Sequence, residues 1–106
     1  MFNYFFGSDS RSLTYLKFLN DNTQNLTVVT TYPVKTGRGK KVKSNIIEDF
    51  CVENSIDFKY FNQNETYEDM SNALCVSFKN IFSQEFLSKN SNIYNIHLSL
   101  LPKFKG

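Results

Sequence analysis

The chain of 106 residues has no tryptophan, two prolines, two cysteines and a single histidine. Cys51 and Cys75 do not form a Cys-X-X-Cys motif and no secretory signal accompanies them, so two reduced, buried thiols are expected rather than a disulfide. One histidine gives little support to a metal centre. No apolar run approaches the roughly 20 residues of a membrane-spanning helix. The opening stretch MFNYFFGSDS predicts a strand and a turn, not a targeting peptide.

The length suits one domain and is too short for two. Hydrophobic residues make up 41% and aromatic residues 16% of the chain, with 11 phenylalanines, so a packed core is expected and disorder is not. The net charge of +2 is too small to indicate nucleic-acid binding by itself. The distribution of the charge along the chain is therefore more informative than the net charge. The chain is also expected to be a monomer.

Five apolar or β-branched stretches have the length of a strand, namely residues 2–6, 26–32, 56–61, 73–78 and 93–98. Helical patterns separate most of them. Because strands that alternate with helices form βαβ units, the order predicts an α/β fold with a parallel sheet and flanking helices. Ligands of such sheets bind at the carboxyl ends of the strands, which are expected near Gly7, Thr31 and His97.

The helical patterns begin at residues that can cap a helix. The first follows Asp9 or Ser10 and carries leucines at every third position, 13, 16 and 19. The second begins near Asn45, with Glu48 placed for a capping box. A short third helix is expected over residues 83–88. Of the remaining segments, 33–43 is expected to be a loop, and 62–72 to hold one or two helical turns.

The segment 33–43 concentrates positive charge. No acid lies between Tyr32 and Ile47, and the segment holds five of the twelve basic residues: Lys35, Arg38, Lys40, Lys41 and Lys43. One interpretation is a solvated loop that keeps the chain soluble. The other is an electrostatic grip on a polyanion such as a chain of phosphates. Neither a GxxxxGK[ST] nor a GxGxxG motif is present, so no nucleotide-binding fingerprint accompanies the loop.

Asn95 and His97 lie two residues apart on the last expected strand, so both side chains point to the same face. One interpretation is a buried histidine satisfied by hydrogen bonds. The other is catalytic: the amide donates to a carbonyl oxygen that becomes an oxyanion, while the imidazole donates or shuttles a proton.

Four stretches, in order and at matching spacing, resemble one family. NIHLSLLPKFKG is similar to the N-H-SLLP-RG signature of folate-dependent formyltransferases, which have a Rossmann-like formyltransferase fold. VVTTYPVKTGRGKKVKSNIIEDF resembles the second strand and basic loop of the methionyl-tRNA formyltransferases among them. FFGSDSRSLTYL resembles their first strand and turn. CVSFKNIFSQEFL is similar to the segment before the signature, in its mitochondrial form.

The resemblance implies transfer of a formyl group from 10-formyltetrahydrofolate to the amine of initiator methionyl-tRNA. Asn95 would steady the oxyanion, His97 would support proton transfer, and the basic segment 35–43 would hold the tRNA acceptor arm. Further residues are implied to wall the folate pocket, namely Phe78, Lys79, Ile81, Phe82, Ser99, Leu100, Leu101 and Pro102. Lys79 departs from the family, which usually has glycine at that position.

The resemblance also implies that residues 1–106 form an incomplete N-terminal catalytic domain, truncated after the fifth strand and without the family's C-terminal domain. The family's catalytic aspartate would follow the glycine that matches Gly106. A sugar-nucleotide or other small-amine acceptor stays open as an alternative, as does an inactive fragment or paralogue. The mitochondrial form of residues 76–87 favours the mitochondrial matrix, with a bacterial cytoplasm as the alternative.

Overall fold

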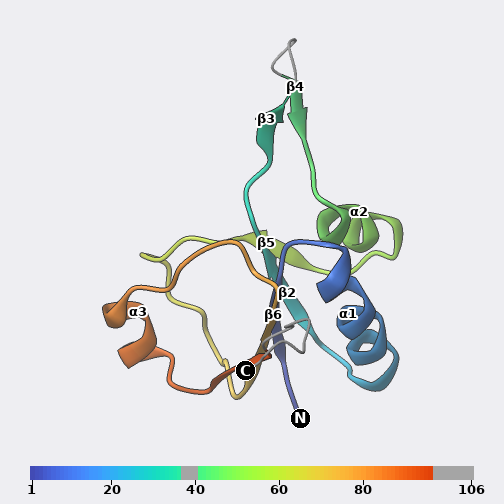
Figure 1. Cartoon of the computed structure of the whole chain (residues 1–106). Helices are drawn as coiled ribbons and strands as arrows, with labels where there is room; N and C mark the ends of the chain where they lie inside the picture. Colours follow the sequence, from blue (N-terminus) through green and yellow to red (C-terminus); the bar gives the residue numbers. More distant parts are fainter. Residues whose placement is uncertain (37–40, 97–106) are drawn as a thin grey trace, which may run out of the picture.

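The computed structural model describes residues 1–36 and 41–96. In chain order the elements are β1 (Tyr4–Gly7), α1 (Ser10–Asn22), β2 (Thr27–Thr30), β3 (Val34–Thr36), β4 (Lys41–Lys43), α2 (Ile46–Glu53), β5 (Phe58–Tyr60), β6 (Ala73–Val76), α3 (Gln84–Lys89) and β7 (Ile93–Ile96). Five strands form the main sheet, and β3 and β4 form a separate ribbon that rises away from it (Figure 1).

The main sheet has the strand order β5-β2-β1-β6-β7, and each neighbouring pair is parallel. The chain begins in the middle, builds β2 and β5 on one side, and then crosses to build β6 and β7 on the other. This order confirms the predicted α/β fold with a parallel sheet and flanking helices. It also places a topological switch point between β1 and β6, and a switch point is where open sheets of this kind bind ligands.

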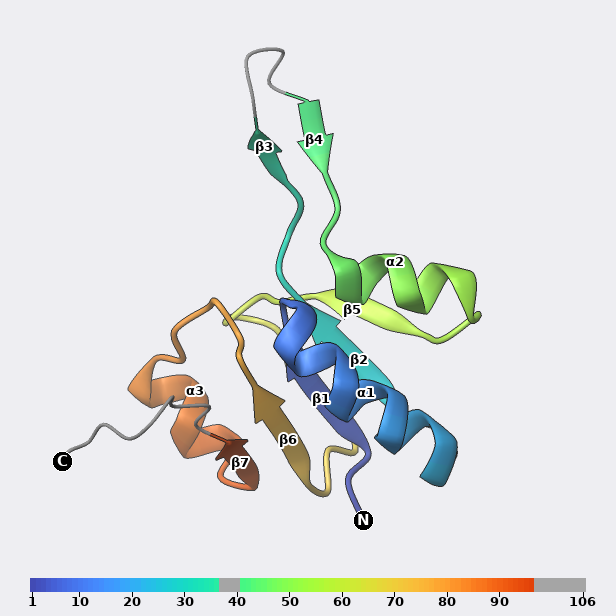
Figure 2. The ribbon, with the colours of Figure 1, turned by 45° about the vertical axis from the view of Figure 1, so that its right-hand side comes forward.

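The helices divide between the two faces of the sheet, with α1 and α2 on one face and α3 on the other (Figure 2). The neighbours Phe5 and Phe6 are both fully buried but belong to different clusters, because successive side chains of a strand point to opposite faces. On the α1 side Phe5 packs with Leu16 and Ile47. On the α3 side Phe6 packs with Phe86 and other aromatic residues.

Polar side chains set where α1 and α2 begin. The Asp9 carboxylate accepts the backbone N–H of Arg11 at 3.0 Å and of Ser12 at 3.2 Å, and the Ser12 hydroxyl oxygen accepts from the Asp9 backbone, which completes a capping box. At α2 only half of the expected capping box forms. Asn45 accepts the backbone N–H of Glu48, but Glu48 Oε2 instead accepts a hydrogen bond from the Tyr60 hydroxyl at 2.8 Å.

Two segment predictions were wrong. Residues 33–43 were expected to be a loop, yet β3 and β4 pair in antiparallel fashion within it, with Val34 opposite Lys43 and Lys35 opposite Val42. Glycine and lysine weaken the strand signal in the sequence, whereas pairing across the ribbon supplies backbone hydrogen bonds. Residues 62–72 form turns rather than a helix, because Tyr67 enters the aromatic cluster and its hydroxyl accepts the backbone N–H of Asn62.

Candidate functional site

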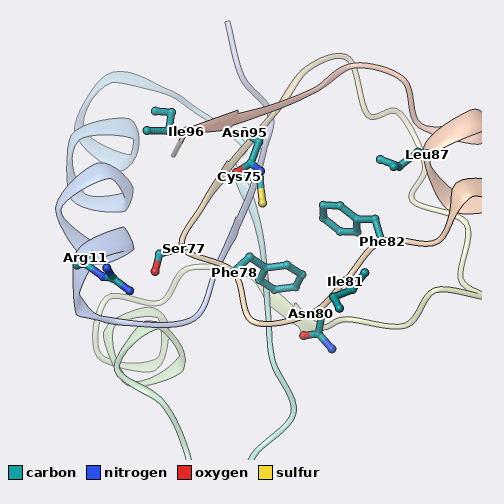
Figure 3. Close-up of a pocket in the computed structure, with 10 residues that line it drawn as sticks. All are labelled: Arg11, Cys75, Ser77, Phe78, Asn80, Ile81, Phe82, Leu87, Asn95 and Ile96. Atoms are coloured by element: carbon teal, nitrogen blue, oxygen red, sulfur yellow. The ribbon is translucent and has the colours of Figure 1, made fainter. Parts of the chain in front are cut away.

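A cavity of about 460 Å³ opens at the carboxyl ends of β6 and β7 (Figure 3). That volume lies within the range of roughly 300–1,000 Å³ that small-molecule sites occupy. The residues that line it come from α1, β6, β7, α3 and the segment between β6 and α3. They are Arg11, Cys75, Ser77, Phe78, Asn80, Ile81, Phe82, Leu87, Asn95 and Ile96. We call this cavity the cleft.

Asn95 brings an amide to the cleft. It stands opposite Cys75 in the parallel register of β6 and β7, and its side chain is exposed. Burial raises the pKa of the Cys75 thiol to about 11, so at neutral pH this sulfur is protonated and is a poor nucleophile. The amide of Asn95 is therefore the more useful group on this wall, because it can donate to an oxygen that gains negative charge.

Aromatic rings form the opposite, apolar wall. Phe78 and Phe82 stack with their centroids 5.7 Å apart, and each also meets Phe6 edge to face, at 5.6 and 5.5 Å. These contacts join the wall to the buried aromatic cluster beneath the sheet. Ile81 is 83% exposed at the rim. The wall is thus set by core packing and does not depend on a ligand for its shape.

Charged and hydroxyl groups form the rim of the cleft near α1. The Ser77 hydroxyl donates to Asp9 Oδ2 at 2.5 Å, and the Arg11 guanidinium lies 3.4 Å from the same oxygen. Burial raises the pKa of the Asp9 carboxyl, but hydrogen bonds from Ser77, Ser12 and Arg11 outweigh it, and the net effect lowers this pKa. Asp9 is accordingly ionised at neutral pH and holds Arg11 at the edge of the cleft.

A second, smaller cavity of about 130 Å³ lies between the base of the β3–β4 ribbon and the segment after β6. Its lining residues are Ser8, Thr31, Tyr32, Val34, Lys43, Ser44, Asn45 and Lys79. Lys79, which the resemblance assigned to the folate pocket, therefore lies in this second cavity and is absent from the lining of the cleft.

Hydrogen bonds join the two cavities. The backbone N–H of Lys79 donates to Ser8 Oγ at 3.1 Å, Ser8 Oγ and Thr31 Oγ1 are 2.6 Å apart, and Thr31 Oγ1 donates to Asn80 Oδ1 at 3.0 Å. Since the single hydroxyl proton of Thr31 points to Asn80, the Ser8 hydroxyl donates to Thr31. The ends of β1, β2 and β6 are held together by this chain of bonds.

The buried Thr30 fixes the start of α2 against the sheet. Its hydroxyl donates to the Gly7 carbonyl at 2.7 Å and accepts from the Asn45 side-chain amide at 2.9 Å. Only Ser44 separates Asn45 from β4, so the end of the ribbon at Lys43 is tied to β1 and β2. The orientation of the ribbon relative to the cleft therefore depends on buried polar contacts.

Apart from Lys79, which lines the second cavity, the predicted site residues fall into three groups. Four of them line the cleft, namely Asn95, Phe78, Ile81 and Phe82. Lys35 lies in β3, and Lys41 and Lys43 in β4. The cross-strand register places the side chains of Lys35 and Lys43 on opposite faces of the ribbon. The remaining predicted residues lie outside the described residues: His97, Ser99, Leu100, Leu101, Pro102, Arg38 and Lys40.

Sequence reasoning missed several residues of the cleft. Ser77 directly follows β6, so the rule that ligands bind at the carboxyl ends of strands could have found it. Arg11 and Leu87 gave no such signal, because they reach the cleft only through the placement of α1 and α3 on the sheet. Within residues 1–36 and 41–96, no three histidine, cysteine, aspartate or glutamate side chains gather as a metal site would require. In the same residues no helix is both long and apolar enough to traverse a bilayer.

An open cleft at the carboxyl ends of parallel strands, with an amide on one wall and stacked rings on the other, is typical of small-molecule sites in α/β domains. Residues 4–106 match the formyl transferase family, and the chain belongs to that family. The family resemblance seen in the sequence is thereby confirmed.

Two curated relatives are similar over most of the chain. The methionyl-tRNA formyltransferase of Endomicrobium trichonymphae is 32% identical over 110 residues, covering 96% of this chain and 35% of the relative. The methionyl-tRNA formyltransferase of Thermotoga sp. (strain RQ2) is 30% identical over 112 residues, covering 96% of this chain and 36% of the relative. The chain thus spans about a third of the length of these relatives.

Proposed function

We propose that this chain carries part of the active site of an enzyme that transfers a formyl group from 10-formyltetrahydrofolate to the amine of initiator methionyl-tRNA. The observation that carries the proposal is the exposed amide of Asn95 on a cleft walled by Phe78, Ile81 and Phe82. Membership of the formyl transferase family and the names of both relatives support it.

The residues of the cleft match the two chemical parts of a folate. A folate has a flat fused ring system and a glutamate tail that carries carboxylates. The stacked rings of Phe78 and Phe82 offer apolar contact to the flat part. The guanidinium of Arg11 comes from the α1 side of the cleft, where it can pair with a carboxylate (Figure 3).

The reaction needs a hydrogen-bond donor that stabilises the oxyanion, and a group that transfers one proton. The methionyl amine attacks the formyl carbon, a new C–N bond forms, and the carbonyl electron pair moves onto oxygen. The N–H of Asn95 is proposed to donate to that oxygen. When the intermediate collapses, the C–N bond to the folate breaks. The attacking nitrogen loses a proton and the departing nitrogen gains one, and His97 is the residue proposed to carry it.

The β3–β4 ribbon is the proposed tRNA contact. Lys35 and Lys43 place positive charge on both of its faces, and the sequence adds Arg38, Lys40 and Lys41 to the same segment. Contacts between lysine or arginine and phosphates dominate the affinity of proteins for nucleic acids and weaken as salt rises. The ribbon projects from the main sheet (Figure 1), and such a projection suits contact with an acceptor arm whose end enters the cleft.

The test is formyl transfer to methionyl-tRNA by the natural full-length protein. Asn95→Ala and the isosteric Asn95→Asp, which has no N–H to donate, should each lower kcat by about 10²-fold or more. Asn64→Ala, in an exposed turn, is the matched control and should leave kcat unchanged. A wild-type protein that is folded but shows no formyl transfer to methionyl-tRNA would refute the proposal. Transfer to a small amine that tRNA does not inhibit would instead support the alternative acceptor class.

A further inference from the structure

The small cavity at the base of the ribbon brings together two lysines that lie far apart in the sequence. Lys43 ends β4, and Lys79 lies in the segment between β6 and α3. The hydroxyl-bearing residues Ser8 and Thr31 also line the cavity, and Tyr32 forms part of its wall. The hydroxyl protons of Ser8 and Thr31 are already donated, to Thr31 and Asn80, so the two lysine ammonium groups are the cationic donors that an anion such as a phosphate would meet there.

The size of the cavity limits what can enter. Its volume of about 130 Å³ is well below the roughly 300 Å³ at which sites for whole small molecules begin. A single tetrahedral anion with its oxygens is a suitable occupant, whereas a complete nucleotide is not. The cleft next to it is more than three times larger, at about 460 Å³, so the two cavities suit different groups.

The two carboxylates in the first turn of α2 each accept a hydrogen bond from a hydroxyl group. Glu48 accepts from the Tyr60 hydroxyl at 2.8 Å, and Asp49 accepts from the Ser44 hydroxyl at 2.5 Å. Among the described residues neither Lys43 nor Lys79 takes part in an ion pair. The two ammonium groups therefore have no direct carboxylate partner in this part of the chain.

The cavity also lies on the path from the ribbon to the cleft. It includes Val34 at the start of β3, while the hydrogen bond from Thr31 to Asn80 leads directly to the lining of the cleft. We propose that this cavity binds one backbone phosphate of the RNA acceptor strand and so sets how far the strand reaches into the cleft. This inference rests on the proposed function, and it assigns Lys79 to RNA rather than to folate.

The experiment measures binding of a single-stranded RNA with the acceptor-end sequence to the full-length protein at several salt concentrations. The double variant Lys43→Gln/Lys79→Gln should reduce the slope of log K against log salt by about 0.7, the value of one phosphate contact on a single strand, and each single variant should reduce it by less. Lys89→Gln is the matched control, because Lys89 is exposed on α3, lies outside the cavity lining, and forms an ion pair with Glu85. It should leave the slope unchanged.

A scan with single methylphosphonate linkages, each of which removes the charge of one phosphate, then locates the contact. One linkage should weaken binding to the wild type by several-fold and have no effect on the double variant Lys43→Gln/Lys79→Gln. If every linkage weakens both proteins equally, or if Lys89→Gln lowers the slope as much, the phosphate site is wrong. These results leave the proposed function intact, whereas a wild-type protein that binds no RNA overturns both.

Discussion

On one face of the sheet, α1 and α2 pack over mainly aliphatic side chains such as Leu16, Val28 and Ile47. On the other face, α3 and long connecting segments cover a cluster of rings that includes Phe6, Phe61 and Phe86 (Figure 2). A helix satisfies most of its own backbone hydrogen bonds, but a connecting segment does not. The connecting segments of the second face therefore depend on side-chain hydrogen bonds along their length, whereas the helices of the first face use them chiefly at their ends.

Tyrosine hydroxyls supply such bonds on the aromatic face. The Tyr4 hydroxyl donates to the Glu68 carbonyl at 2.7 Å, and the Tyr67 hydroxyl accepts the backbone N–H of Asn62 at 3.0 Å. Rings of the same cluster, those of Phe78 and Phe82, continue upward as the wall of the cleft. The helix-covered face thus mainly stabilises the domain, while the aromatic face both stabilises it and shapes the proposed site.

The strongest test compares two neighbours in β1. Phe5→Ala and Phe6→Ala should each lower the free energy of unfolding by about 3–5 kcal/mol, because both side chains are fully buried. The milder Phe5→Leu and Phe6→Leu, at about 1–2 kcal/mol each, keep the domain folded for binding measurements. Only Phe6→Leu should weaken folate binding, since Phe6 contacts Phe78 and Phe82. Equal losses of binding in both leucine variants would refute the division between the faces.

The next test adds a methyl group at Gly7, where it would contact only the helix-covered face of the sheet. A Cβ at Gly7 would lie 2.7 Å from Phe5 Cε2 and 2.8 Å from Ser12 Cβ, and because no rotamer of Ser12 moves its Cβ, relief of the second contact requires movement of the backbone. Gly7→Ala should therefore lower the free energy of unfolding by about 1–3 kcal/mol. Ser91→Ala, at an exposed position, should change it by less than about 0.5 kcal/mol. Chemical denaturation measures both, and an unchanged midpoint for Gly7→Ala would contradict the close packing.

A smaller effect is expected from the aromatic face. Tyr4→Phe removes the hydrogen bond to Glu68 and should cost about 0.5–1.5 kcal/mol, with faster amide hydrogen exchange over residues 62–72. Tyr94→Phe, with a ring that is 49% exposed, is the control. Slower or unaltered exchange in Tyr4→Phe would show that the segment is held in another way.

The same bond has a predictable pH dependence. Burial raises the pKa of the Tyr4 phenol above its usual 10.0. Because the folded-state pKa is the higher one, the contribution is complete below about pH 10 and is lost as the pH rises through that folded-state pKa. The difference in stability between wild type and Tyr4→Phe should accordingly be constant from pH 6 to 9.

The smallest effect concerns the two thiols, one on each face. Burial, together with the Glu48 carboxylate, raises the pKa of Cys51 to about 12, while burial raises that of Cys75 to about 11. Cys75 also lines the cleft. Iodoacetamide should modify Cys75 faster than Cys51, and a folate in the cleft should slow only Cys75. Mass spectrometry of each cysteine measures the two rates, and faster modification of Cys51 would reverse the comparison.

Local patterns predicted most of the elements. Helix α1 was predicted from its leucine spacing and from the cap at Asp9, and β2 from the β-branched residues around Val28. These patterns involve residues that are close in sequence, so the sequence alone reveals them. The ribbon and the turns of residues 62–72 were not predicted, because Val34–Lys43 pairing and the burial of Tyr67 join positions whose local propensities favour other conformations. The lining of the cleft divides in the same way. Asn95 was predicted from a short sequence motif, whereas Arg11 reaches the cleft only through the placement of α1 on the sheet.

The amino-acid sequence by itself determined the family, the parallel α/β architecture and the places where strands end, since periodicity and short motifs encode all three. Only the tertiary structure decided which side chains share a cavity. It placed Phe78 and Phe82 with Asn95 in the cleft, and moved Lys79 to the small cavity beside Lys43. The physical reason is that such groupings depend on the crossing of the chain from β5 to β6 and on the helix placement, which are long-range packing events.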